Sequence, residues 1–146
     1  MRDPARLRGK SDSRLKLAKT GPGQWEFDFA TDNMSPDAAK YQARATGTPV
    51  GKGYYISGSK GRVQFDGYRN GTLLEAKYYT EGGRFLNDPN WRIITKGWEL
   101  LKQARAQLAV AGSTPIEWRV ASPRAAQLIQ QLFDFNKIKI AVRYFP

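Results

Sequence analysis

The sequence predicts a single α/β domain in which helices pack on a mixed β-sheet, and three patterns along its 146 residues lead to that prediction. Strand-like runs flank Asn70-Gly71, the dipeptide most typical of a two-residue β-hairpin turn. Two segments each begin with a capping residue followed by proline and end at glycine, as helices do. Near the C-terminus, residues 116–121, 123–133 and 137–145 have the strand, helix, strand spacing of a parallel pair.

The N-terminal part of the chain differs in composition from the rest. Met1 to Lys19 contains seven Lys or Arg residues and two Asp, so we expect residues 1–33 to be a basic linker or arm that is partly disordered. A linker left from a longer parent chain is favoured over a nucleic-acid-binding arm, because a basic run alone is a weak signal. Trp25 to Phe29 alternates polar and aromatic residues, which indicates a short strand or an extended segment. Nothing in the sequence places its acidic residues, Glu26 and Asp28, near a site.

The first predicted helix opens the folded domain, which we expect to span residues 34–146. Ser35 is its expected N-cap, Pro36 occupies its first position, and Gly47 lies just beyond its end. Gln42, in the middle of this helix, is able to reach a site on the neighbouring strands.

The predicted hairpin follows a short strand, Tyr54 to Ser57, with which it would form an antiparallel meander of three strands. If Asn70-Gly71 is the two-residue loop, Arg69 pairs with Thr72, since both central residues of a type I′ turn have positive φ. The sheet is then completed by a helix, a strand, a helix and a strand.

The long helix is predicted between its cap Asp88 and the stop signal Gly112. One helical stripe, expected to face the core, consists of Trp91, Ile94, Trp98, Leu101 and Leu108. A second stripe consists of Arg92, Lys96, Glu99 and Gln103. The second stripe is typical of a solvated helix surface, and the alternative is that Lys96 or Gln103 contacts nucleic acid or supports a site.

Two residue types that often carry catalysis are absent. The chain has no Cys and no His, which excludes disulfides, zinc–thiolate sites and His-based catalytic triads. Any catalysis must therefore use carboxylates, Lys, Tyr, Ser, Thr or Gln.

The formal net charge of +11 predicts a polyanionic partner, either nucleic acid or an anionic membrane surface. No apolar run approaches the roughly 18 residues of a membrane-spanning helix, and no signal peptide is evident, so we expect no membrane insertion. Nucleic acid is the better candidate.

Continuing the hairpin register places Asp66 opposite Glu75 and Gln64 opposite Lys77, with all four side chains on one face. Two carboxylate residues directly across a strand pair have Cβ atoms about 5 Å apart, and their like charges repel each other. A hard cation such as Mg²⁺ relieves that repulsion, and Lys77 beside it would stabilise a phosphate. The alternative is a solvated hairpin face with an exposed ion pair.

Two motifs carry a resemblance to a known family. The sequences F-D-G-Y-R-N-G-T-L-L-E-A-K (65–77) and P-I-E-W-R-V-A-S-P-R-A-A (115–126) resemble restriction-endonuclease-fold toxin domains of bacterial polymorphic toxins, within the PD-(D/E)XK nuclease superfamily. The resemblance covers residues 35–145 and implies a restriction-endonuclease-like core. It implies Asp66 and Glu75 as metal ligands, Lys77 as the catalytic lysine and Gln103 as a supporting glutamine.

The chain departs from the superfamily pattern at two positions. The first helix offers only Asp37 and Gln42 where many members carry a glutamate, and Phe65 replaces the proline that precedes the first motif aspartate. The geometry of the site at that helix is therefore not predicted.

The resemblance implies a Mg²⁺- or Mn²⁺-dependent endonuclease toxin that hydrolyses DNA in competing bacteria. An RNA-cleaving toxin and a non-catalytic nucleic-acid-binding module of the same fold are the alternatives. It further implies export from the producer cytoplasm through a specialised secretion system, action in the target-cell cytoplasm, and an acidic immunity protein as partner.

Overall fold

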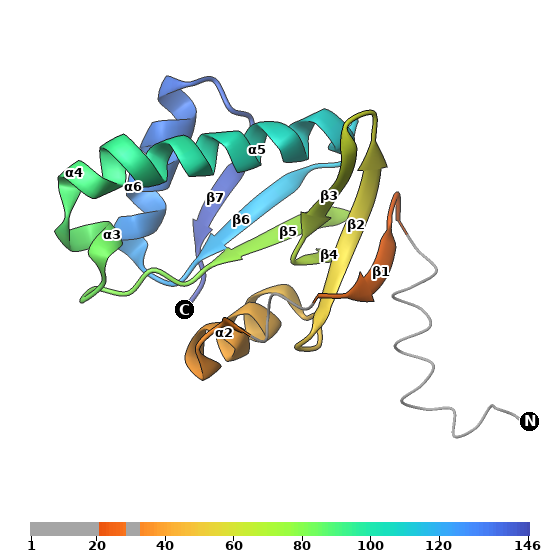
Figure 1. Ribbon diagram of the computed structural model, residues 1–146, viewed down its shortest axis with the longest axis horizontal. Coiled ribbons are helices and arrows are strands. Elements are labelled where there is room, and N and C mark those ends of the chain that lie inside the picture. Colours follow the sequence, from red (N-terminus) through yellow and green to blue (C-terminus); the bar gives the residue numbers. More distant parts are fainter. Residues whose placement is uncertain (1–20, 29–32) are drawn as a thin grey trace, which may run out of the picture.

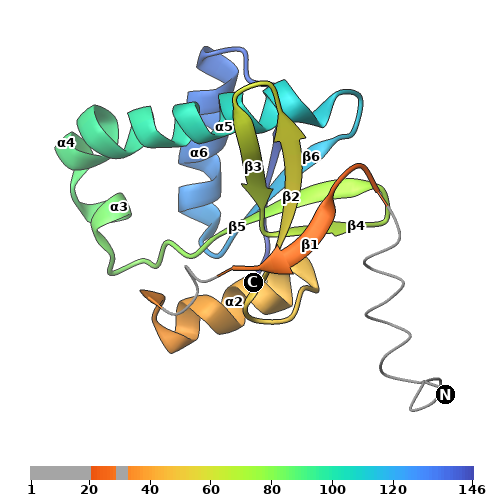
Figure 2. The same cartoon turned by 45° about the vertical axis from the view of Figure 1, so that its right-hand side comes forward.

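The computed structural model describes residues 21–28 and 33–146, and their strands form two sheets that meet at an angle (Figures 1 and 2). The first sheet is antiparallel and has the order β1-β2-β3. The second sheet has the order β4-β5-β6-β7, with β4 antiparallel to β5 and with β5, β6 and β7 parallel. The predicted mixed α/β architecture is confirmed. The strands are β1 (Gln24–Phe27), β2 (Lys52–Gly58), β3 (Gly61–Phe65), β4 (Gly67–Arg69), β5 (Thr72–Lys77), β6 (Ile116–Val120) and β7 (Ala141–Tyr144).

The predicted hairpin turn is confirmed, but the predicted strand pairing does not continue as far as Gln64 and Lys77. Arg69 pairs with Thr72, and Asn70 and Gly71 have φ values of 52° and 79°, as a type I′ turn requires. The chain bends at Asp66, however, so that β3 pairs with β2 in the first sheet while β4 pairs with β5 in the second. Gln64 consequently lies opposite Tyr55 and not opposite Lys77.

Close packing at Gly67 accompanies this bend. A Cβ atom at Gly67 would lie 2.6 Å from Thr48 Oγ1 and 2.9 Å from Thr46 Cβ, so only glycine lets the strand pass so near the loop after the first helix. The predicted three-stranded meander is thereby divided between two sheets.

Part of the predicted N-terminal arm belongs to the first sheet. β1 lies within residues 1–33 and pairs with β2, with Trp25 opposite Tyr54. Residues 1–20 and 29–32 lie outside the described residues, so the basic arm stays a prediction there.

The first helix, α2 (Pro36–Thr46), forms where its caps predict. Ser35 accepts a hydrogen bond from the Ala38 amide, and Gly47 closes the helix with a φ of 69°. α2 packs against β4 and β5, and its Ala45 carbonyl accepts a hydrogen bond of 2.7 Å from Arg119 Nη1 in β6.

Helices α5 (Gly97–Ala111) and α6 (Pro123–Phe135) lie on the side of the second sheet opposite to α2 (Figure 1). α6 packs against β6 and β7, while α5 lies across the junction of the sheets and contacts β2 and β3 (Figure 1). Leu73 and Leu74 are both buried, although neighbouring strand residues point to opposite faces, so β5 is covered on both sides. The short helices α3 (Arg84–Asn87) and α4 (Pro89–Trp91) connect β5 to this layer.

The predicted core stripe of the long helix is wrong at two positions. Ile94 is 74 % exposed and Trp98 is 66 % exposed, whereas Leu100, Ala104 and Gln107 are buried. Ile94 lies in a π-helical segment, η2 (Arg92–Lys96), which interrupts the α-helix, whereas Trp98 lies after this segment, in α5, on the side turned away from the buried Leu100. A π-turn adds one residue, so the side chains before it are rotated by roughly 100° relative to a continuous helix.

The last strand is shorter than predicted. Only Ala141–Tyr144 is strand, because Lys137 has a φ of 57° and the Ile138 amide bonds back to the Phe133 carbonyl. Ile138 and Ile140 are nevertheless buried, as the alternation in the sequence predicts.

Within residues 21–28 and 33–146, no helix has both the length and the apolar character required to cross a membrane.

Candidate active site

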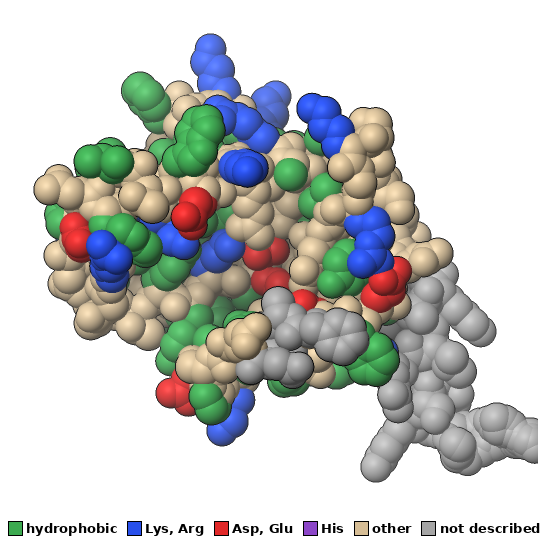
Figure 3. Space-filling view, in the orientation of Figure 1, with side chains coloured by type: hydrophobic (Ala, Val, Ile, Leu, Met, Phe, Trp, Pro, Cys, Tyr) green, Lys and Arg blue, Asp and Glu red, His purple; other side chains and the backbone are tan. Residues whose placement is uncertain are grey.

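A cavity of about 210 Å³ opens at the junction of the two sheets, between α2 and α5. Figure 3 shows acidic side chains gathered in this hollow in the middle of the face, with basic side chains beside them. The lining residues are predominantly polar and come from five parts of the chain: Asp28, Met34, Gln42, Gln64, Asp66, Glu75 and Gln103.

Asp66 and Glu75 are brought together by the bend between β3 and β4. The β4–β5 ladder ends with Gly67 opposite Leu74, so Asp66 continues the register toward Glu75, and its Oδ2 accepts a hydrogen bond from the amide of the next residue, Ala76. The two residues are only 8 % and 5 % exposed. The alternative of a solvated hairpin face is therefore wrong.

The two carboxyl groups differ in their surroundings. Burial, followed by the negative charge of Glu75, raises the pKa of Asp66 well above its ordinary value. The Ala76 amide, which donates to Asp66 Oδ2 at 2.8 Å, and the charge of Lys77 oppose this rise without cancelling it. Without a cation, the pair therefore favours a proton on Asp66.

Glu75 receives hydrogen bonds from helix α5 on both of its oxygens. Gln103 Nε2 donates to Oε2 at 2.8 Å, and Gln107 Nε2 donates to Oε1 at 3.0 Å. These two donors fix the orientation of the Glu75 carboxylate.

Lys77 lies beside Glu75 with its ammonium group held from two directions. Its Nζ donates to Gln103 Oε1 at 2.6 Å, lies 3.3 Å from Glu75 Oε2, and sits 4.9 Å from the centre of the Trp118 ring. The Lys77 side chain is 16 % exposed and lies next to the cavity, behind its lining residues Glu75 and Gln103.

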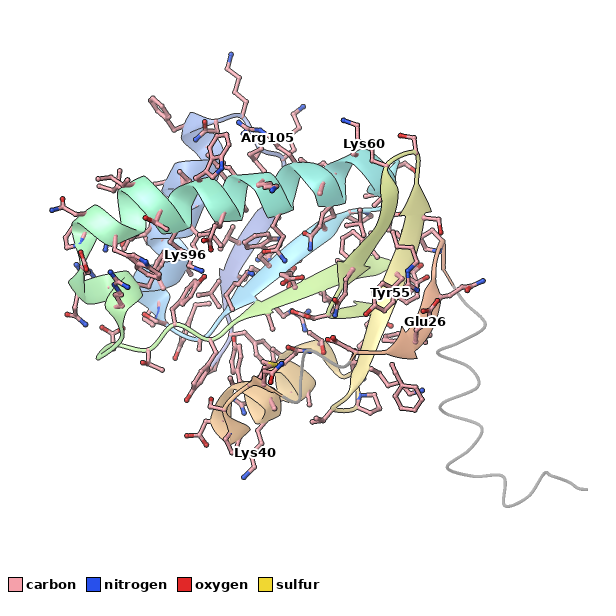
Figure 4. All side chains as sticks on the ribbon, viewed as in Figure 1. Glu26, Lys40, Tyr55, Lys60, Lys96 and Arg105 are labelled. Carbon is pink, nitrogen blue, oxygen red and sulfur yellow. The ribbon has the colours of Figure 1, made fainter. Side chains whose placement is uncertain are left out.

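The remaining predicted residues divide into two groups. Gln42 and Gln64 line the cavity, and Gln64 Nε2 donates to Asp28 Oδ2 at 2.6 Å. Lys96 does not line it, because its Nζ donates to Glu99 at 2.8 Å and lies over the Trp91 ring. Figure 4 labels Lys96 toward the α4 end of the helical segment. A contact between Lys96 and nucleic acid stays a prediction.

Sequence reasoning missed three residues at this site: Asp28, Gln107 and Trp118. Asp28 follows β1 and reaches the cavity because β1 pairs with β2, a pairing between distant segments that local patterns do not reveal. Gln107 lies four residues after Gln103, and this helical spacing is a signal that both amides share one face. Trp118 Nε1 donates to Gln107 Oε1 at 2.9 Å.

Asp66 and Glu75 are the residues best suited to a divalent cation. In the part of the chain that the structure describes, no three acidic side chains lie close enough together to hold a metal ion. A hard cation bound by two carboxylates takes its other ligands from water or substrate phosphate, which is usual for Mg²⁺. The adjoining buried carboxylates fit such an ion, because its charge would relieve the repulsion that raises the pKa of Asp66.

Comparison with protein-family models gives one match. Residues 38–123 match the family described as restriction endonuclease fold toxin 5, and the matched range contains both sheet-junction carboxylates and helix α5. Neither the curated proteins nor the solved structures that were compared with the chain include a match.

Proposed function

Because the chain belongs to the family of restriction endonuclease fold toxins, we propose that it is a metal-dependent endonuclease that hydrolyses phosphodiester bonds of DNA. The observation that carries this proposal is the buried pair of Asp66 and Glu75, with the Lys77 ammonium beside it, in a cavity open to the surface. A buried carboxylate pair lowers stability unless hydrogen bonds or a bound cation offset its negative charge.

Asp66 and Glu75 would hold Mg²⁺ or Mn²⁺ in this proposal. The bound ion supplies Lewis acidity, which polarises the phosphate and lowers the pKa of a water. Gln103 and Gln107 hold the Glu75 carboxylate with both oxygens hydrogen bonded, so its orientation is fixed before substrate arrives.

Lys77 would stabilise the negative charge that develops on the phosphate. Gln103 accepts a hydrogen bond from its Nζ, which leaves the remaining ammonium protons for a phosphate oxygen or the attacking water. Gln42 and Gln64 line the same opening and offer neutral amide donors to the substrate backbone.

The charge of the chain supports a nucleic-acid substrate. A net charge of +11 attracts a polyanion, and Figure 3 shows Lys and Arg side chains around the acidic hollow. Opposite charges inside and around the hollow fit a cation site that is surrounded by phosphate contacts.

The decisive test is a cleavage assay with a matched variant. Wild-type protein should nick supercoiled plasmid only when Mg²⁺ or Mn²⁺ is present, and Glu75→Gln should lower the rate by about 100-fold or more. Glu117→Gln is the control, because Glu117 lies in the neighbouring strand β6 and pairs with Arg119 and Arg143 away from the cavity.

Three outcomes would contradict parts of the proposal. Equal cleavage by wild type and Glu75→Gln would remove Glu75 from the site. Cleavage of total RNA but not of plasmid would change the substrate class. Binding of DNA without metal-dependent cleavage would favour a non-catalytic module of the same fold.

The toxin family also supports a proposal about where the protein acts. After export from the producer cytoplasm it would cleave nucleic acid in the cytoplasm of a competing bacterium, and the producer would carry an acidic immunity protein that covers the cavity. Expression in a bacterial host should arrest growth for wild type and not for Glu75→Gln. Co-expression of the immunity protein should restore growth.

A further inference from the structure

A chain of hydrogen bonds extends from the site into the core of the protein. Trp118 Nε1 donates to Gln107 Oε1 at 2.9 Å, and Gln107 Nε2 donates in turn to Glu75 Oε1 at 3.0 Å. Trp118 and Gln107 are both fully buried, so neither has water as an alternative partner. Burying a glutamine in the core is costly unless its amide is hydrogen bonded, and here each end of the amide has a partner.

The donor on Trp118 determines which way the Gln107 amide points. An indole N–H can only donate, so the atom facing it must be the amide oxygen. The amide nitrogen is then directed at Glu75, and it also lies 3.4 Å from the Gln64 carbonyl in β3. The orientation of the Gln107 amide thus follows from its contact with the Trp118 N–H, which can only donate.

Gln103 is oriented in the same way by a different donor. Lys77 Nζ can only donate, so it selects the oxygen of Gln103 and leaves Gln103 Nε2 for Glu75 Oε2. Each oxygen of Glu75 therefore faces an amide whose direction is set by a donor-only group.

We propose that Gln107 and Trp118 form a positioning pair that fixes Glu75 in the orientation required for cation binding. The proposal rests on the proposed function, because it assigns to Glu75 the role of a metal ligand. Neither residue lines the cavity, so both act through Glu75 and not on the substrate.

The test compares variants that remove one link at a time. Gln107→Met keeps the length and flexibility of the side chain but removes its hydrogen bonds with Glu75, Trp118 and the Gln64 carbonyl. Trp118→Phe keeps an aromatic ring against Phe133, which lies 5.0 Å away between ring centres, and removes the orienting donor together with one of the two rings of the indole that lies under Lys77. Gln127→Met, on the exposed side of α6, is the matched control.

The first readout is the Mg²⁺ concentration that gives half-maximal cleavage. Gln107→Met should raise it by roughly 10- to 100-fold, and Trp118→Phe should raise it less, since groups behind a metal ligand typically change affinity by that range. Saturating Mg²⁺ should restore most of the wild-type rate. A fall in rate with an unchanged Mg²⁺ requirement would overturn the inference, because it would indicate a structural role.

The second readout does not depend on cleavage. In a ¹H–¹⁵N spectrum, the indole N–H signal of Trp118, identified by its loss in Trp118→Phe, should shift when Mg²⁺ is added to wild type. It should not shift in Gln107→Met, whose folding is checked by its thermal melt. If the chemical shift of the Trp118 indole N–H in wild type does not change on addition of Mg²⁺, the inference is overturned.

The two readouts separate this inference from the proposed function. A wild-type protein that shows the Mg²⁺-dependent indole shift but cleaves neither DNA nor RNA would contradict the nuclease proposal and support the positioning pair. If the wild type cleaves with Mg²⁺ and all variants need the same Mg²⁺ concentration as the wild type, the nuclease proposal is supported and the positioning pair is contradicted.

Discussion

The two ends of the helical segment from Pro89 to Ala111 differ in which side chains they bury: apolar side chains are exposed at one end, and a polar side chain is buried at the other. At the η2 end, Ile94 and Trp98 are apolar and largely exposed. At the other end, in α5, Gln107 is polar and has no exposed surface. Burial along one helix is thus decided by what lies opposite each side chain. Gln107 meets Trp118 and Glu75, whereas the π-turn rotates Ile94 away from the core.

The largest effect, on the rate of cleavage, is expected from Lys77, which contacts Gln103 of α5 and Glu75 at the site. Lys77→Met keeps the apolar stem over Trp118 and removes the charge, so cleavage of plasmid at saturating Mg²⁺ should fall by about 100-fold or more. Lys60→Met, in the turn between β2 and β3 and labelled in Figure 4, should leave the rate unchanged. A Lys77→Met protein with wild-type activity would show that the Lys77 ammonium has only a structural role.

A stability difference within the helical segment comes next. Leu100→Ala should lower the free energy of unfolding by about 2–4 kcal/mol, because the side chain is buried and its removal leaves a cavity. Ile94→Ala should change it by less than about 0.5 kcal/mol. Urea denaturation of both variants measures the contrast, and comparable losses would mean that Ile94 packs as a continuous helix predicts.

Asp66→Asn is expected to stabilise the protein in the absence of metal. The asparagine can still accept from the Ala76 amide, but it carries no charge to repel Glu75, so the unfolding free energy should rise by about 1 kcal/mol, or roughly 3–5 °C in Tm. Added Mg²⁺ should raise the Tm of wild type and not that of the variant. Asp134→Asn, at an exposed position in α6, is the control.

The sign of the pH dependence follows from the raised pKa of Asp66. A raised folded-state pKa means that stability is gained as the pH falls and the carboxyl takes up its proton. The advantage of Asp66→Asn over metal-free wild type should therefore shrink on acidification. An advantage that grows at lower pH would contradict the assignment of the proton to Asp66.

The smallest effect is expected at the apolar end. Trp98→Gln should alter the unfolding free energy by no more than about 0.5 kcal/mol, because two thirds of the side chain is already exposed. A thermal melt measures the change, and a loss of several degrees in Tm would show that Trp98 packs against a neighbouring surface.

Local chemistry predicted much of the fold. Ser35, Gly47 and the Asn70-Gly71 turn each occupy the positions that their backbone preferences demand, and the parallel pairing of β6 and β7 follows from their spacing. The same local logic placed Asp66 near Glu75, since only a few residues separate each from the turn.

The features that sequence reasoning missed depend on distant partners. The chain bends at Asp66 because β3 pairs with β2 in one sheet while β4 pairs with β5 in the other. No pattern within the hairpin sequence predicts that its strands belong to two different sheets. The π-turn adds a residue without any composition signal. Asp28 reaches the cavity through a strand pair formed with residues about 25 positions later.

The hydrogen bonds from helix α5 to Glu75 also determine when activity can appear during folding. Asp66 sits between two sheets that are separately hydrogen bonded, while Glu75 belongs to the second sheet and its glutamine partners to a helix that contacts the first. An intermediate with complete strands but with α5 undocked would have the carboxylate pair without the two glutamines that orient Glu75. Cleavage activity should consequently return only in the last phase of refolding, when α5 docks, after the far-ultraviolet circular dichroism has already recovered.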